Sequence, residues 1–285
     1  MKEQLEQLLQ ERVDVYISGS AERAECTRAS RKLESLRERS AEIVNVKAGG
    51  MVKSVRQEQR NITIDYDVHY KYLIKQKELL YLEEEIEHRQ AVFEGNRMVM
   101  DDVQPVLFSS AESEEAEGED VRAVYTYNRL KAVQYAERWW NEFNPGYKKF
   151  QDDCTNFISQ CLRAGGAPVW GQPQRQRGWW YTGKTWSYSW AVAHSLKLYL
   201  GRSKGLKTRM VSKPEELTYG DIICYDFEGD GRYNHNTIVT GRDAYGMPLV
   251  NAHTTNSRMR YWKYEDSTAY TPRIKYAFFK IVTDS

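Results

Sequence analysis

Apolar residues in the first forty positions recur three and four apart, as they do on one face of an α-helix. In residues 2–17 these positions are Leu5, Leu8, Leu9 and Val13. The spacing breaks at residues 18–20 and resumes across residues 21–41. The sequence therefore predicts a helix or a pair of helices at its start.

From about residue 43 the period of the pattern changes to two. Residues 61–74 (NITIDYDVHYKYLI) alternate apolar and polar side chains, as a strand with one buried face does. A second strand pair is predicted at residues 81–93 and 97–103, on either side of a turn at residues 94–96. The first part of the chain is therefore expected to be α+β, with helices packed on an antiparallel sheet.

A dense acidic stretch follows at residues 106–122, with six Asp and Glu side chains. Like charges at this density repel one another and oppose collapse, so the stretch is predicted to be a linker. We therefore expect an accessory domain in residues 1–105, an acidic linker in residues 106–122 and a second domain in residues 123–285.

The second domain is predicted to begin with helices. Helical spacing runs through residues 127–143 and stops at the Asn-Pro-Gly of residues 144–146. A second helix is predicted from Asp152 and Asp153 to the glycine pair at 165–166, and a third over residues 189–200. Residues 170–190, rich in Trp, Tyr, Gly and Arg, have no clear period, and we interpret them as a large surface loop.

The remainder of the second domain is predicted to be strands. Apolar runs separated by turn residues occur at residues 220–227, 235–241, 247–254 and 273–282. Helices followed by antiparallel strands define a second α+β domain.

Charge and aromatic residues divide between the two parts. Residues 1–122 hold 18 basic and 26 acidic residues, a net charge of −8, whereas residues 123–285 hold 23 basic and 14 acidic residues, a net charge of +9. All eight tryptophans lie in the second part. A basic, aromatic surface attracts anionic or carbohydrate partners. The alternative is that the basic residues only solvate a domain with many exposed strands.

The apolar runs and the cysteines of the sequence bear on where the protein acts and on whether its cysteines form disulfides. No run of about 18 apolar residues occurs, and the charged start MKEQLEQLLQERVDV is unlike the apolar core of a signal peptide. Four cysteines in 285 residues are too sparse for a disulfide framework, so each is considered as a thiol. We expect a cytoplasmic or spore-associated protein without a membrane span, unless a leader precedes this sequence.

Cys154 is the first candidate for chemistry. It follows Asp152 and Asp153, which suit a helix N-cap, so its sulfur would lie at the positive end of a helix dipole beside unpaired backbone N–H groups. Both effects lower the pKa of a thiol and favour a nucleophile. The alternative is a core cysteine, because Cys154 is in register with the apolar face that contains Phe157 and Cys161.

A nucleophilic thiol also needs a base, and His235 and His253 lie in the strands that follow the Cys154 helix. Asn251 and His253 are two residues apart, so both would face the same side of a strand. A cysteine, a histidine and an orienting amide or imidazole form a catalytic triad. The alternative for each histidine is a half-buried sheet residue bonded to the backbone.

Four segments carry a family resemblance: residues 127–166 with their DCTNFISQ motif, the WSYSW of residues 186–190, residues 220–241 with their HNTIVT, and the NAHTTN of residues 251–256. Together they resemble the bacterial putative amidase domain family, which is similar to papain-like hydrolases of the NlpC and CHAP types that cleave amide bonds in peptidoglycan. The resemblance covers about residues 123–285 and implies a papain-like fold there.

The resemblance implies roles for individual residues. It makes Cys154 the nucleophile and His235 the general base and acid, and it leaves the orienting position to either His253 or Asn251. Asp153 and Asn156 belong to the same motif, with capping and bracing as their expected role.

We therefore expect a cysteine amidase or peptidase that acts on peptidoglycan or a peptide and needs no cofactor. The alternative is a catalytically inactive papain-like module that binds wall glycan or a protein. Nucleic-acid binding is not expected, because the basic residues form no dense stripe. The acidic turn at residues 226–231 lacks the length and the final glutamate of a calcium loop, and the sequence has no Cys/His spacing for zinc.

Overall fold

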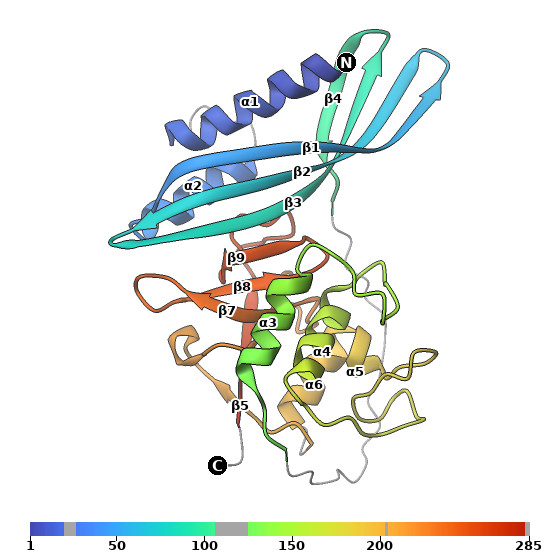
Figure 1. The fold of residues 1–285 in the computed structure, drawn as a ribbon, viewed down its shortest axis with the longest axis vertical. Coiled ribbons are helices and arrows are strands. Elements are labelled where there is room, and N and C mark those ends of the chain that lie inside the picture. Colours follow the sequence, from blue (N-terminus) through green and yellow to red (C-terminus); the bar gives the residue numbers. More distant parts are fainter. Residues whose placement is uncertain (20–26, 106–124, 203–204, 283–285) are drawn as a thin grey trace. The chain divides into compact units, whose positions relative to one another are not determined.

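The structure, a computed structural model, describes residues 1–19, 27–105, 125–202 and 205–282. The chain forms two compact units. The first comprises Met1–Val106 and Thr255–Ala269, and the second comprises Leu107–Thr254 and Tyr270–Ser285. Both units combine helices with antiparallel strands, which confirms the α+β class (Figure 1). The acidic stretch at residues 106–122 lies outside the described residues.

The first unit pairs two helices with long strands. Its elements are α1 (Lys2–Ser18), α2 (Thr27–Glu38), β1 (Glu42–Glu58), β2 (Asn61–Gln76), β3 (Leu79–Glu94), β4 (Arg97–Val103) and β9 (Ser257–Tyr261). β2 pairs with β1 on one side and β3 on the other, and both β4 and β9 pair with β3. Within the described residues, the predicted helices, the strand over residues 61–74 and the strand pair on either side of residues 94–96 are confirmed.

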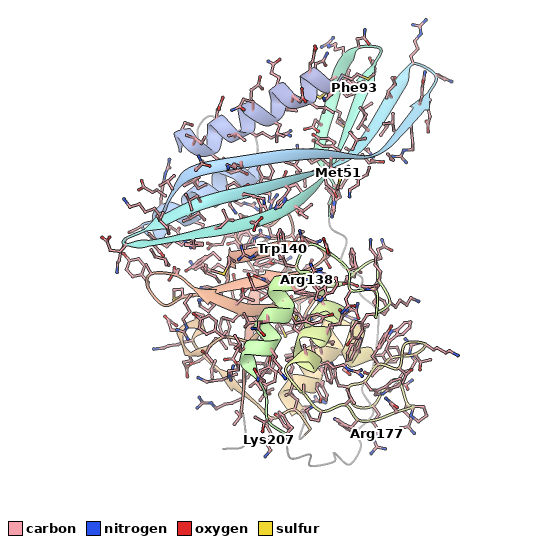
Figure 2. The ribbon with its side chains drawn as sticks, in the orientation of Figure 1. Met51, Phe93, Arg138, Trp140, Arg177 and Lys207 are labelled. Carbon is pink, nitrogen blue, oxygen red and sulfur yellow. The ribbon has the colours of Figure 1, made fainter. Side chains whose placement is uncertain are left out.

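The period-two pattern of β2 explains how this sheet buries one face. Tyr70 and Tyr72 are buried on β2, and the ring of Tyr16 from α1 packs edge-on against both. The ammonium group of Lys32 from α2 lies 4.6 Å from the centre of the Tyr72 ring. Both helices thus cover the same face of β2. Figure 2 marks Phe93, a fully buried residue of β3, and Met51, an exposed residue of β1.

Residues Thr255–Ala269 belong to the first unit. The second unit is therefore not the continuous stretch that was expected for residues 123–285. In β9, Ser257 pairs with Glu85 and Arg258 pairs with Glu84 of β3. This strand was not predicted, because its short sequence SRMRY contains only one aliphatic residue.

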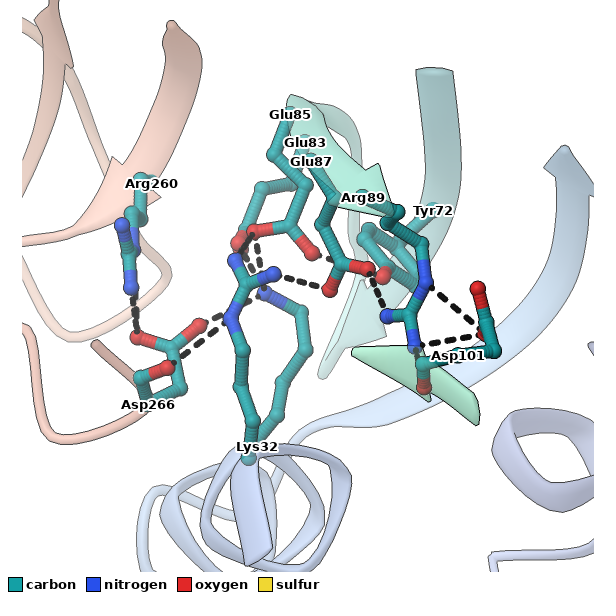
Figure 3. A network of polar contacts seen from close by, with 10 residues as sticks. Lys32, Tyr72, Glu83, Glu85, Glu87, Arg89, Asp101, Arg260 and Asp266 are labelled. Carbon is teal, nitrogen blue, oxygen red and sulfur yellow. Dashed lines mark hydrogen bonds and ion pairs between the residues drawn. The ribbon is translucent and has the colours of Figure 1, made fainter. Parts of the chain in front are cut away.

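A buried ionic network explains why this segment packs in the first unit (Figure 3). Lys32 Nζ lies 3.0 Å from Asp266 and also contacts Glu83. Arg260 Nη2 lies 2.6 Å from Asp266 Oδ1. The network continues through other buried or nearly buried charges from α2, β3 and β4, namely Arg28, Glu85, Glu87, Arg89 and Asp101.

The second unit places helices against a five-stranded antiparallel sheet. Its elements are α3 (Arg129–Trp139), α4 (Cys154–Ala164), α5 (Tyr188–Ala191), α6 (Ala193–Arg202), β5 (Thr208–Val211), the 3-10 helix η2 (Pro214–Glu216), β6 (Ile222–Asp226), β7 (His235–Arg242), β8 (Pro248–Ala252) and β10 (Lys275–Ile281). The strand order is β8-β7-β6-β10-β5. α3, α4 and α6 share one core with this sheet, and its members include Phe157, Ile158, Leu196 and Ile238.

Several boundaries differ from the predicted ones. The first helix of this unit ends at Trp139, before the Asn-Pro-Gly stop, where exposed Arg138 adjoins buried Trp140 (Figure 2). The third helix is divided at Val192, whose backbone is extended. The predicted strand 247–254 ends at Ala252, so His253 lies in the turn that follows β8.

The prediction of a surface loop over residues 170–190 is wrong for most of its tryptophans. Trp179, Trp180 and Trp190 are fully buried, and Trp170 and Trp186 are partly buried. Their indole rings supply a large apolar area to the core, and the N–H of a buried tryptophan needs an acceptor. The Trp179 N–H donates to Ser159 Oγ at 2.9 Å, and the Trp190 N–H donates to Asn156 Oδ1 at 2.8 Å.

Within the described residues, no helix has the length and hydropathy needed to cross a membrane.

Candidate active site

The candidate nucleophile Cys154 is the first residue of α4, as the sequence predicts. Asp153, which precedes it, does not cap the helix with its side chain. Instead, Asp153 Oδ1 accepts hydrogen bonds from the Phe150 N–H at 3.0 Å and from Asn156 Nδ2 at 2.9 Å. The side chain of Asp153 therefore braces the turn that leads into α4.

Thr254 takes the capping role that the sequence assigned to the aspartates. Its Oγ1 accepts hydrogen bonds from the backbone N–H of Asp153 at 3.1 Å and of Cys154 at 3.0 Å. The first N–H groups of a helix have no partner within the helix, so a side-chain oxygen from elsewhere satisfies them here. Sequence reasoning missed Thr254, because it lies one hundred positions after Cys154.

Three hydrogen-bonding groups surround the Cys154 sulfur. Thr155 Oγ1 lies 3.7 Å from Sγ, the one hydrogen bond of the sulfur among the described residues. Thr155, the backbone N–H of Asn236 and the hydroxyl of Thr254 each stabilise a thiolate and lower the pKa of Cys154. The site is thus arranged to hold negative charge on sulfur.

Burial outweighs these three groups in the resting structure. Cys154 is only 2% exposed, and desolvation raises its pKa to about 11, with a smaller contribution in the same direction from the charge of Asp152. The sequence-based expectation of a lowered pKa is therefore wrong for this state, because it counted the helix terminus and omitted the cost of desolvating a thiolate. Burial also raises the pKa of Cys161 and Cys224, with a larger rise at Cys224 than at Cys154.

β7 places His235 and Asn236 at its first two positions. Asn236 is fully buried, and its Nδ2 donates to Thr155 Oγ1 at 3.0 Å. Among the described residues, Asn236 Oδ1 has no hydrogen-bond partner. Asn236 therefore contacts the nucleophile's neighbour with its side chain and the nucleophile itself with its backbone.

The candidate base His235 is one residue from the peptide N–H that contacts Cys154 Sγ. The His235 side chain is fully buried, and its ring packs against Tyr225 at 5.6 Å and Phe227 at 6.1 Å between ring centres. Tyr225 is also the cross-strand partner of His235 in β6. Because side chains alternate along a strand, Asn236 faces α4 and the His235 ring lies on the side of these aromatic residues.

The two candidates for the orienting position occupy different places. His253 Nδ1 lies 2.8 Å from Asp153 Oδ2, and its Nε2 donates to the Trp139 carbonyl oxygen at 2.7 Å. Asn251 donates to Glu137 Oε1 at 2.8 Å and accepts from Thr240 Oγ1 at 2.7 Å. His253 therefore supports the residue before the nucleophile, whereas Asn251 joins β8 to α3.

Exposed cations lie close to the start of α4 in the sequence and contact aromatic rings. Lys149 Nζ is 4.0 Å from the centre of the Phe143 ring, and that ring packs edge-on against His253. Lys148 Nζ is 4.7 Å from the centre of the Trp186 ring. These contacts place positive charge on the segment that leads into Cys154.

The carboxylate groups considered as metal ligands are already bonded to cations or to backbone N–H groups. In the described part of the chain, one group of three has suitable spacing: Glu83, Glu85 and Asp266. Lys32 contacts all three. In the acidic turn, Asp226 accepts hydrogen bonds from the backbone N–H groups of Gly229, Asp230 and Gly231. Neither arrangement therefore offers ready ligands to a cation.

Comparison with known proteins gives the family of this chain. The model of a family described as "Putative amidase domain" matches residues 126–279, and the chain belongs to this family. The matched range contains Cys154, His235, Asn251 and His253. Membership of this family supports the assignment of the chain to an amidase-like class of protein.

Two curated proteins of Bacillus subtilis (strain 168) are similar to the chain. "Uncharacterized protein YhbB" is 49% identical over 298 residues, which cover 99% of this chain and 96% of that protein. "Uncharacterized protein YjcM" is 32% identical over 143 residues, which cover 47% of this chain and 32% of that protein. No solved structure matches the chain.

Proposed function

We propose that the protein is a cysteine-dependent amide hydrolase with a papain-like second unit. Cys154 Sγ attacks the carbonyl carbon of an amide, and His235 takes the thiol proton and passes it to the leaving amine. The C–N bond breaks, and a thioester joins the acyl group to Cys154. Water, deprotonated by His235, then hydrolyses the thioester and regenerates the thiol.

The main support is the environment of Cys154 Sγ. Thr155 bonds to the sulfur of a cysteine on the first turn of a helix, Thr254 accepts the N–H of the same cysteine, and the N–H of Asn236 lowers the pKa of its thiol. A core cysteine needs none of these contacts, because a thiol behaves as a small apolar group. The buried acceptor Asn236 Oδ1 adds to this support, since an acceptor left without a partner costs about 1–3 kcal/mol and calls for a functional explanation.

His253, Asp153 and Asn156 act as positioning residues in this proposal. His253 and Asn156 both bond to the Asp153 carboxylate, and Asn156 also accepts the indole N–H of Trp190. These contacts fix the turn on which Cys154 is carried. Asn251 is kept as the rival for the residue that orients His235, although its cross-strand partner in β7 is Ile238 and its side chain bonds to Glu137 and Thr240.

The resting site must open before it can react. Burial keeps the thiol protonated at neutral pH, since the pKa of Cys154 is about 11. Water or substrate that enters the site reduces the desolvation of the thiolate, while the groups that stabilise the thiolate stay in place. The pKa of Cys154 then falls. The His235 ring lies on the opposite side of β7 from the Asn236 side chain that bonds to α4, so the proposal requires the start of β7 to rearrange before His235 reaches the sulfur.

An anionic peptide or the peptide part of peptidoglycan is the proposed substrate. Residues 123–285 have a net charge of +9. Lys148 and Lys149 are exposed on the segment before Cys154. Stacking of sugar rings on Trp179, Trp180 or Trp190 is not part of the proposal, because these rings are fully buried.

The burial of Cys154 also favours a second candidate function. In this alternative, the second unit is an inactive module that binds wall glycan or a protein partner, and the thiol never ionises. The two candidates differ in one measurable property, which is whether amide cleavage requires the sulfur of Cys154.

The test is hydrolysis of purified wall fragments and of acidic peptides, with new amines identified by mass spectrometry. The unmodified protein should release amines, and Cys154→Ala and His235→Ala should abolish release. Cys161→Ala is the matched control, because Cys161 is a buried cysteine of the same helix, and this variant should retain activity if it folds. Equal activity in Cys154→Ala would overturn the proposal. Binding of fragments without any cleavage would favour the inactive module.

A further inference from the structure

The hydroxyl group of Thr254 lies at both the backbone N–H and the thiol of Cys154. Thr254 Oγ1 accepts the backbone N–H of Cys154 at 3.0 Å, and the same hydroxyl lowers the pKa of the Cys154 thiol. It also accepts the N–H of Asp153 at 3.1 Å. The Thr254 oxygen therefore lies beside the sulfur and in front of two backbone donors.

The backbone of Thr254 adopts an unfavourable conformation in this position. Its φ angle is +77°, in the left-handed region that β-branched residues rarely adopt. Strain of this kind persists only where the surrounding contacts impose it, and it concentrates at functional sites. The turn after β8 is thus held in a conformation that brings this hydroxyl to the start of α4.

The proposed reaction needs the same position for another atom. When Sγ attacks an amide, the carbonyl oxygen becomes an oxyanion, and a backbone N–H within about 3 Å stabilises its charge. The N–H of Cys154 is suited to this task, because it has no helical partner and lies beside the sulfur. In the resting structure, the Thr254 oxygen is bonded to that N–H.

We propose that Thr254 keeps the resting site closed, because its hydroxyl occupies the position of the substrate's carbonyl oxygen and leaves when an amide binds. The inference rests on the proposed function. It makes Thr254 a positioning residue, which protects the resting thiol from small electrophiles and is displaced by a group that offers its own oxygen to the two N–H donors.

Alkylation of the full-length protein by iodoacetamide tests this inference. Thr254→Gly removes the hydroxyl, and glycine adopts a positive φ without penalty, so the turn is expected to persist. Thr254→Ser keeps the hydroxyl and is the matched control. The labelling rate of each cysteine is followed at pH 8 by mass spectrometry of its peptide.

Thr254→Gly should be labelled at Cys154 on the order of tenfold faster than the unmodified protein, because removing the side chain uncovers Sγ, and desolvation influences the pKa of this thiol more than the lost contact with the hydroxyl does. Thr254→Ser should stay within about threefold of the unmodified protein, since it makes the same bonds. An unchanged or slower rate in Thr254→Gly would overturn the inference and leave Thr254 as a simple helix cap. Cys161 and Cys224, both fully buried, report folding, because their labelling marks an unfolded variant.

If Thr254→Gly unfolds, amide hydrogen exchange in the unmodified protein tests whether the Thr254 hydroxyl holds the N–H groups of Asp153 and Cys154. The N–H groups of Asp153 and Cys154 precede the hydrogen-bond ladder of α4, so Thr254 is their protecting partner. Exchange at the rate of an unstructured peptide of the same sequence overturns the inference, whereas slower exchange supports its premise that the Thr254 hydroxyl holds both donors in the resting protein. Labelling and exchange require no turnover, so either can fail while hydrolysis that depends on Cys154 stands.

Discussion

His253 Nδ1 lies 2.8 Å from Asp153 Oδ2, and each side chain is only 3% exposed. The other ring nitrogen of His253 donates to the carbonyl oxygen of Trp139, the last residue of α3. The ring also stacks on Phe157, with 4.1 Å between ring centres. This histidine therefore joins the residue before Cys154 to α3 and to the core face of α4.

We predict that His253→Gln lowers the free energy of unfolding by about 1–3 kcal/mol, because a buried carboxylate and a buried carbonyl lose well-placed partners. Urea denaturation measures this change. His88→Gln is the matched control: His88 also bonds to an aspartate, at 2.6 Å from Asp67, but its side chain is 49% exposed. The control should change stability by less than about 1 kcal/mol. Equal losses in the two variants would contradict the bracing role of His253.

The pH dependence of alkylation provides a second prediction. Burial raises the pKa of Cys154 to about 11, so its labelling by iodoacetamide should keep increasing between pH 8 and pH 10. A rate that levels off below pH 8.5 would contradict the buried resting state. Cys154 should nevertheless be labelled faster than Cys161 and Cys224, because Thr155 and the backbone N–H of Asn236 stabilise its thiolate.

The same raised pKa affects stability with a defined sign. The folded state holds the Cys154 proton more tightly than the unfolded chain does, so this stabilisation is complete below about pH 8.5 and is lost as the pH rises toward 11. Cys154→Ala should therefore lose less stability than the unmodified protein between pH 8.5 and pH 10.5. Parallel stability curves over this range would refute the prediction.

The ionic network of the first unit gives a further prediction. Lys32→Met should destabilise the protein by about 3–5 kcal/mol, because it leaves buried carboxylates without a partner. Lys53→Met is the matched control, since Lys53 forms its ion pair with Asp67 while 47% exposed, and such pairs contribute at most about 1 kcal/mol. Urea denaturation of both variants checks the difference. A similar small effect for both would show that the network contributes little.

Acid should weaken this network. Burial alone would raise the pKa of Asp266, but attraction to Arg260, Lys32 and Arg28 holds that pKa well below its usual range. The stabilisation is therefore complete above the ordinary aspartate pKa of about 3.9 and is lost as the pH falls through the lower, folded value. Asp266→Asn should remove this part of the acid dependence, measured as the free energy of unfolding between pH 5 and pH 2.5.

Local sequence patterns predicted most elements of the fold. The period-two pattern of residues 61–74 identified β2, and the apolar face from Cys154 to Leu162 identified α4. Patterns failed where a distant partner decides the structure. β9 forms because Ser257 and Arg258 pair with β3, and the tryptophans of residues 170–190 are buried because polar groups such as Ser159 and Asn156 accept their N–H donors.

The candidate site was predicted only in part for the same reason. The position of Cys154 at a helix start follows from its own neighbours in the sequence. The cap comes from Thr254, 100 positions after Cys154, and Asn236 lies 81 positions after Thr155. The pKa of the thiol depends on how completely these segments bury it, and this cannot be derived from a helix pattern.

Trapping of a covalent intermediate tests the central claim most directly. The full-length protein is mixed with a wall fragment or acidic peptide that it cleaves, quenched in acid within the first turnovers and analysed by peptide mass spectrometry. The account predicts an acyl group on the peptide that contains Cys154, and no such adduct in Cys154→Ala. Amide cleavage without an adduct on Cys154, or cleavage that persists in Cys154→Ala, would contradict it.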